Sequence, residues 1–182
     1  MDVDRQLAAE LGFPKTKYMA VERERRWLCR QLPRLPVRGA DMITDLYVTG
    51  TCLRLREARP TDGGAPILRF TRKADADRYT RLLTSIYLPE HEFALLAASL
   101  PGKRIKKLRH RFHDAQGVVL VVDEFLEQLA GLFIAEAEFE TQGELEAYAG
   151  PDFAVCEITD RPEFGGAQLA IHGMPEDLPR LL

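Results

Sequence analysis

The sequence has few cysteines, and they are not spaced for metal or disulfide chemistry. Cys29, Cys52 and Cys156 are an odd number, and none belongs to a Cys-x-x-Cys pair. Neither a disulfide framework nor a zinc site is indicated, so we expect a reducing, cytoplasmic location. The first five residues, Met1-Asp2-Val3-Asp4-Arg5, contain two acids and no apolar stretch, which argues against a secretory signal.

Long apolar runs and an excess of positive charge are also absent. No segment approaches the roughly 18 apolar residues that span a bilayer, so we expect no membrane association. Lysine and arginine number 25 against 28 aspartates and glutamates, which gives a formal net charge of −3. Without a global positive field we expect no nucleic-acid partner. The 182 residues suit one domain with a substantial core.

Charged side chains, by contrast, recur at every second position inside segments that otherwise read as strands. Successive side chains of a strand point to opposite faces, so each set lies on one face. The sets are Glu22, Glu24 and Arg26; Arg54 and Arg56; Arg69, Thr71 and Lys73; Lys107, Arg109 and Arg111; and Glu136, Glu138 and Glu140. Several strands carry mostly one sign of charge, which favours a charged cavity over an ordinary solvent-exposed face.

Eight segments read as strands, separated by short loops rich in glycine, aspartate and proline. They lie near 18–28, 43–49, 52–59, 66–74, 79–88, 103–113, 117–126 and 131–140. Eight strands in one chain favour a mainly β (α+β) fold, with an eight-stranded antiparallel β-barrel or tunnel and a few flanking helices. We expect Trp27 and Phe125 to pack outward from this barrel.

Helices are expected in the remaining parts of the chain. The expected segments are 90–100, 142–149, a final turn or two after Gly165-Gly166, and a short helix over 2–11; residues 154–159 read as one more strand or an edge extension. We therefore divide the chain into an N-terminal extension, 1–17, and a single tunnel domain, 18–182.

Basic and acidic strands that share one interior would need a ligand, because burying charges with only one another as partners is costly. Arginine and lysine match phosphate oxygens, while carboxylates are hard ligands suited to Mg²⁺ or Mn²⁺. Any single motif has a simpler explanation, since a lone Glu-x-Glu strand usually faces solvent. The joint occurrence of the motifs predicts a metal-assisted phosphoryl-transfer site.

The order of these motifs resembles the CYTH superfamily, also called the triphosphate tunnel metalloenzymes. The family patterns are Glu-x-Glu-x-Lys, Arg-x-Arg, Leu-Thr-x-Lys, Ile-x-Lys-x-Arg, Val-Asp-x-Phe, Gly-Leu-x-x-Ala-Glu-x-Glu and Glu-Val-Thr. The similar segments here begin at Glu22, Arg54, Phe70, Ile105, Val122, Gly131 and Glu157, in that order. Together they cover residues 18 to about 170.

The resemblance implies a hydrophilic β-barrel tunnel that binds a triphosphate. It implies Mg or Mn as the cofactor, with Glu22, Glu24, Glu136 and Glu138 as metal ligands. Asp123, Glu24 and Arg26 would form the catalytic group. The expected phosphate-binding residues are Arg26, Arg54, Arg56, Arg69, Lys73, Arg81, Lys107, Arg109 and Arg111.

Some positions depart from the family pattern. Arg26 stands where the family has lysine, so a planar guanidinium replaces a compact ammonium. Leu83, Ser85 and Val121 stand where the family usually has acids. We therefore expect a triphosphatase of weak activity.

Three functions remain open at this point. The first is a metal-dependent phosphohydrolase acting on inorganic tripolyphosphate or a small organic triphosphate. The second is a class IV adenylate cyclase-like enzyme, although no segment marks an adenine pocket. The third is a non-catalytic protein that binds polyphosphate or nucleotide, which the loss of acids favours. The oligomeric state is open, a homodimer included.

Overall fold

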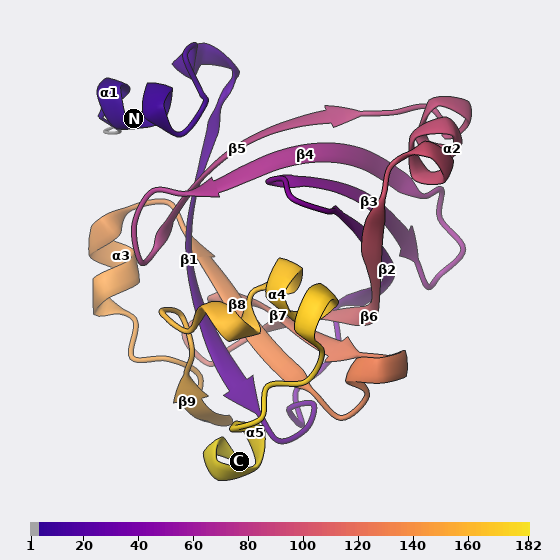
Figure 1. Ribbon diagram of the computed structural model, residues 1–182. Coiled ribbons are helices and arrows are strands. Elements are labelled where there is room, and N and C mark those ends of the chain that lie inside the picture. The colour runs from indigo at the N-terminus through magenta and orange to yellow at the C-terminus, as the bar shows by residue number, and fades with distance from the viewer. Residues whose placement is uncertain (1–3) are drawn as a thin grey trace.

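One antiparallel β-sheet closes on itself in the computed structural model, which describes residues 4–182 (Figure 1). Its strands are β1 Ala20–Cys29, β2 Gly39–Val48, β3 Leu53–Pro60, β4 Ile67–Asp75, β5 Thr80–Tyr87, β6 Gly102–His113, β7 Val119–Phe125, β8 Phe133–Phe139 and β9 Ala154–Glu157. The order β5-β4-β3-β2-β6-β7-β8-β1 is closed by pairing of β1 with β5. The eight-stranded antiparallel barrel and the mainly β class predicted from the sequence are confirmed.

The inner face of the barrel changes character along its length. The charged sets share the inner face with apolar residues of the same strands, because all stand an even number of residues apart. At one end Leu28, Ile105, Phe125 and Ile134 pack together in a fully buried cluster. The expectation that Phe125 packs outward is therefore wrong. Phe125 lies two residues from the inward Asp123 and shares its face.

Strand β1 has two different neighbours on one of its sides. Its first part, Ala20–Arg23, pairs with β5, and its last part, Trp27–Cys29, pairs with β9. Between them the Arg26 N–H donates to the Thr159 hydroxyl at 3.0 Å, and the Glu24 N–H donates to the Tyr79 carbonyl at 2.9 Å. These bonds satisfy the backbone where the ladder changes partner.

Short helices and 3-10 turns precede, connect or follow the strands in the chain. They are α1 Arg5–Glu10, α2 Glu90–Ser99, α3 Gln142–Ala147, α4 Gly166–His172 and α5 Leu178–Leu181, with 3-10 turns η1 Thr16–Tyr18, η2 Glu127–Leu129 and η3 Pro162–Phe164. The predicted helices at 90–100 and 142–149 and the predicted helical tail are confirmed. The helix predicted over 2–11 is present as α1, and residues 2 and 3 lie outside the described part of the chain.

The C-terminal segment closes one end of the barrel. Phe164 of η3, Leu169 of α4 and Leu178 of α5 belong to the same buried cluster as the apolar inner residues. Helix α4 packs against β6 and β2. The opposite end is open, since the side chains of Lys73 and Arg111 are 30% and 42% exposed. No helix in residues 4–182 is long and apolar enough to cross a membrane.

Candidate active site

The barrel interior brings together the residues predicted from the alternating charges. Residues paired across neighbouring antiparallel strands point to the same face. The inward pairs are Glu22 with Arg81, Glu24 with Glu138, Arg26 with Glu136, Arg56 with Arg69, Arg54 with Thr71, and Arg109 with Asp123. Lys73, Lys107 and Arg111 continue the same alternation along β4 and β6. The structure therefore places every predicted site residue on one surface, the tunnel wall.

Strands β1 and β8 form an acidic wall of four glutamates: Glu22, Glu24, Glu136 and Glu138. Three of them face cations, because Lys73 Nζ lies 2.6 Å from Glu22 and 3.0 Å from Glu24, and Arg109 lies 2.6 Å from Glu136. Glu138 forms no ion pair with any residue that the structure describes. Partial burial, together with Glu22, Glu136 and Glu24, raises the pKa of Glu138. Glu138 is thus the one carboxylate of the wall without an ion pair among residues 4–182.

Glu24 is the most strongly held carboxylate of this wall. Burial alone would raise its pKa, but Lys73, Arg26 and Arg81 lower the pKa to about 2. Lys73 responds in the opposite sense, since Glu24 and Glu22 outweigh burial and raise its pKa. Both groups are therefore charged at neutral pH.

Strands β3 and β4 form a basic wall of Arg54, Arg56 and Arg69. Burial and repulsion from Arg56 and Arg54 lower the pKa of Arg69. The Nε atoms of Arg54 and Arg69 are buried and make no hydrogen bond within residues 4–182. Buried donors without partners are costly, so this wall is suited to an anion that accepts from them.

Strands β6 and β7 add a third group, built around Asp123. This carboxylate is fully buried, and Arg109 donates to both of its oxygens at 2.7 Å. Lys107 forms a close ion pair with the same carboxylate. Burial would raise the pKa of Asp123, but Arg109 and Lys107 bring it well below its usual range. Asp123 therefore fixes two predicted phosphate-binding cations, and its predicted catalytic role stays a prediction.

Two other predicted phosphate-binding arginines are largely engaged by the protein itself. Arg81 donates to the backbone carbonyl oxygens of Asp77, Arg78 and Thr80 and pairs with Asp75 at 2.7 Å. Arg26 donates from Nη1 to the Phe164 carbonyl oxygen at 3.1 Å, while its buried Nε makes no hydrogen bond within residues 4–182 and lies 3.9 Å from Glu24 Oε1. Arg81 thus stabilises the β4–β5 turn, and Arg26 keeps one donor available toward the tunnel.

Solved structures of other proteins share this architecture. The inorganic triphosphatase NE1496 is 20% identical, with a TM-score of 0.58 over 82% of this chain and 94% of that protein. The PH1819 protein from Pyrococcus horikoshii OT3 is 21% identical, with a TM-score of 0.50 over 69% of this chain and 82% of that protein. The chain has the CYTH fold. No family model and no curated protein matches the sequence, and likeness at this identity shows the fold alone.

Three positions at which the CYTH family pattern usually has acids carry neutral side chains here, and all three lie on the tunnel wall. Ser85 pairs with Thr71 across β4 and β5, and their hydroxyls hydrogen-bond at 2.7 Å. Leu83 lies opposite Lys73, and Val121 lies opposite Glu136. The register therefore confirms that these positions face inward and carry no charge.

The glutamates of the CYTH tunnel fit Mg²⁺ or Mn²⁺ by their donor chemistry, since all are hard oxygen ligands. Within residues 4–182, no three histidine, cysteine, aspartate or glutamate side chains converge as a metal cluster in this structure. The glutamates form ion pairs with cations: Glu22 and Glu24 pair with Lys73, and Glu136 pairs with Arg109. A divalent cation would relieve the repulsion that acts on Glu138.

Sequence reasoning missed two inward residues of β2, Asp45 and Tyr47. Asp45 is fully buried and receives two hydrogen bonds from Arg56. The Tyr47 ring lies 6.0 Å from the Arg54 guanidinium. Asp41, Ile43, Asp45 and Tyr47 do alternate, but their mixture of acids and apolar residues does not form a one-sign set.

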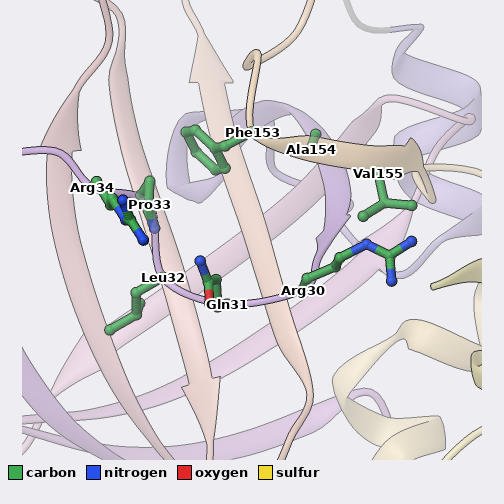
Figure 2. Close-up of a pocket in the computed structure, with 8 residues that line it drawn as sticks. All are labelled: Arg30, Gln31, Leu32, Pro33, Arg34, Phe153, Ala154 and Val155. Carbon is green, nitrogen blue, oxygen red and sulfur yellow. The ribbon is translucent and has the colours of Figure 1, made fainter.

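A separate groove lies outside the barrel, between the β1–β2 loop and the start of β9 (Figure 2). Its volume is about 480 Å³, and its lining includes Arg30, Leu32, Arg34 and Phe153. None of the predicted site residues lines it. The groove is therefore distinct from the charged tunnel.

Proposed function

We propose that this protein is a metal-dependent phosphohydrolase that cleaves inorganic tripolyphosphate or a small organic triphosphate in its tunnel. The observation that carries this proposal is the set of buried guanidinium Nε atoms of Arg26, Arg54 and Arg69, which have no hydrogen-bond partner within residues 4–182. Arg54 and Arg69 share the interior with the acidic wall of β1 and β8, so a ligand would meet cations on one side and carboxylates on another. A phosphate chain with a divalent cation has this distribution of charge.

The basic residues would bind the phosphate chain in two groups. Arg54, Arg56 and Arg69 present donors from β3 and β4, and Lys107 and Arg109 present donors from β6. Lys73 would contact phosphate once Glu22 and Glu24 turn toward a cation. Arg26, Arg81 and Arg111 complete the proposed set, of which Arg111 is held at the open end by Asp41.

The reaction that fits this arrangement is hydrolysis of a phosphoanhydride bond. Water attacks the terminal phosphorus and the bridging P–O bond breaks. The water oxygen stays on orthophosphate with one of its protons, and the other proton passes to the bridging oxygen of the leaving shorter phosphate or to solvent. Mg²⁺ or Mn²⁺ held by Glu22, Glu24, Glu136 and Glu138 would withdraw charge from the phosphate oxygens. Lys107 and Arg109 would stabilise charge that develops on the leaving group.

The acids of the catalytic group are suited to orientation more than to proton abstraction. The pKa of Glu24 is about 2, and the pKa of Asp123 is well below its usual range, so both are weak bases at neutral pH. Phosphoryl transfer depends mainly on positioning and electrostatics, which such groups can supply. With Leu83, Ser85 and Val121 neutral, the tunnel has fewer carboxylates, and we propose that turnover is slow.

The test is an assay of purified protein with tripolyphosphate, ATP and thiamine triphosphate. Each is incubated with Mg²⁺, with Mn²⁺ and with chelator, and orthophosphate and cyclic AMP are quantified. The double variant Glu136→Gln, Glu138→Gln should abolish metal-dependent phosphate release. The matched control is Glu57→Gln, Glu90→Gln, which neutralises two carboxylates outside the tunnel and should leave release unchanged.

The products separate the three functions. Orthophosphate that requires metal and disappears in the Glu136 and Glu138 variant supports the hydrolase. Cyclic AMP from ATP would replace the hydrolase by a cyclase. Tight tripolyphosphate binding with no product from any substrate would overturn the enzyme and leave a phosphate-binding tunnel.

A further inference from the structure

Asp45 is a buried acid in the basic wall. It lies on the inner face of β2, opposite Arg56 of β3, and its side chain is almost fully buried. Arg56 Nε donates to Asp45 Oδ1 and Arg56 Nη2 donates to Oδ2, both at 2.7 Å. Arg54 Nε lies 3.6 Å from Oδ1. One carboxylate thus serves two adjacent arginines.

This contact fixes which donors each arginine keeps for a ligand. Arg56 uses one side of its guanidinium on Asp45, so Nη1 remains without a hydrogen-bond partner in the described residues. Arg54 is too far from Asp45 for a hydrogen bond, and its buried Nε also has no partner there. A planar fork anchored along one edge presents its other edge in a fixed direction.

Asp45 also limits repulsion within the wall. Lys107 faces it from β6, in addition to the two arginines of β3. Arg69 pairs with Arg56 across the strands and has no carboxylate partner within residues 4–182. Without Asp45, three arginines and Lys107 would share this part of the interior with too little negative charge to hold them near one another.

A similar arrangement occurs two strands further round the barrel, where Asp123 of β7 faces cations of β6. Asp123 receives two hydrogen bonds from Arg109 at 2.7 Å and pairs with Lys107. Each buried aspartate therefore faces two cations of one neighbouring strand and receives two hydrogen bonds from the arginine directly opposite it. The second cation differs, because Lys107 hydrogen-bonds Asp123 whereas Arg54 lies 3.6 Å from Asp45.

We propose that Asp45 is a positioning residue, which orients Arg54 and Arg56 so that their unpartnered nitrogens grip the phosphate chain. This inference rests on the proposed function, because it assumes that the tunnel ligand is a triphosphate. Asp45 acts through the arginines and has no contact with the ligand. Removing its charge makes the wall more positive, so simple electrostatics predicts tighter anion binding, whereas positioning predicts weaker binding.

The experiment measures binding and turnover separately. Calorimetry gives the affinity of the metal-free protein for tripolyphosphate, and the phosphate assay gives kcat and KM with Mg²⁺ or Mn²⁺. Asp45→Asn should weaken tripolyphosphate binding by about tenfold or more and raise KM more than it lowers kcat. Asp45→Glu keeps the charge and should restore part of the affinity. The control is Glu57→Gln, the next residue after Arg56, whose carboxylate pairs with the exposed Arg59 on the outer face.

Unchanged or tighter binding in a folded Asp45→Asn variant overturns the inference. If that variant does not fold, Arg56→Gln and the double variant Asp45→Asn, Arg56→Gln are compared. A role through Arg56 predicts that the double variant binds within about twofold of Arg56→Gln, and a further large loss contradicts it. Wild-type binding without turnover overturns the proposed hydrolase and leaves the positioning role intact. No binding of tripolyphosphate by the wild type overturns both.

Discussion

Gly166 begins α4 at the closed end of the tunnel, and Gly166→Ala tests how that end is packed. A methyl group at this position would lie 2.6 Å from Cζ of Tyr47 and closer still to its hydroxyl oxygen. Real side chains do not approach this closely. The substitution must therefore move either α4 or the Tyr47 ring, which lies beside Arg54.

The size of the effect follows from two opposing contributions. Overpacking a well-filled site costs about 1–3 kcal/mol, whereas alanine in place of glycine favours a helix by roughly 0.5–1 kcal/mol. The net loss is on the order of 1–2 kcal/mol. For a chain of this size that corresponds to a Tm about 2–8 °C lower. Differential scanning calorimetry measures it directly.

Gly143 of α3 supplies the matched control, because a methyl group there meets no atom within 4 Å. Gly143→Ala should leave Tm unchanged or raise it. Tyr47→Phe combined with Gly166→Ala should regain part of the lost stability, since the nearest atom is removed. Equal Tm values for Gly166→Ala and Gly143→Ala would refute the close packing of α4 on Tyr47.

Three further predictions concern the hydrogen bond between Arg26 and Thr159 on β1, the buried Asp45 and the cysteine thiols. Thr159→Val removes the acceptor of the buried Arg26 N–H and should cost about 1–3 kcal/mol in denaturant unfolding; unchanged stability would contradict this. Burial would raise the pKa of Asp45, but Arg56 and Arg54 lower it. The ionised Asp45 therefore stabilises the fold at neutral pH, and this stabilisation is lost as the pH falls below 3.8, the ordinary pKa of an aspartate. Asp45→Asn should therefore show a shallower decline of Tm in acid than the wild type, and an equal decline would oppose this account. Iodoacetamide at pH 8 should modify the exposed Cys52 before Cys29, whose pKa burial raises to about 11; mass spectrometry showing the reverse order would refute it.

The sequence predicts the barrel and most of its inner face because strand periodicity is a local property. Arg54 with Arg56 and Glu136 with Glu138 show their common face without any knowledge of tertiary contacts. Once the strands close, such sets can only point inward or outward. The segregation of charge by strand predicts that these side chains point into the barrel, and the strand register confirms this prediction.

The remaining features depend on contacts between distant segments. Alternation with Asp123 puts Phe125 on the inner face, but the sequence near Phe125 does not show that Leu169 and the rest of the C-terminal segment cover an apolar residue there. Asp45 alternates with Ile43 and Tyr47, so the inner face of its strand does not carry charges of one sign and the sequence does not single Asp45 out. Its importance becomes visible only when Arg56 is placed opposite it.

The C-terminal segment, which covers one end of the barrel, limits how a ligand could enter and leave the tunnel. With Phe164 and Leu169 covering one end, a chain of phosphates bound as proposed would enter and leave through the opposite end. A long polyphosphate could insert its end but could not thread through. Product would have to leave before the next molecule enters, so pyrophosphate should compete directly with substrate.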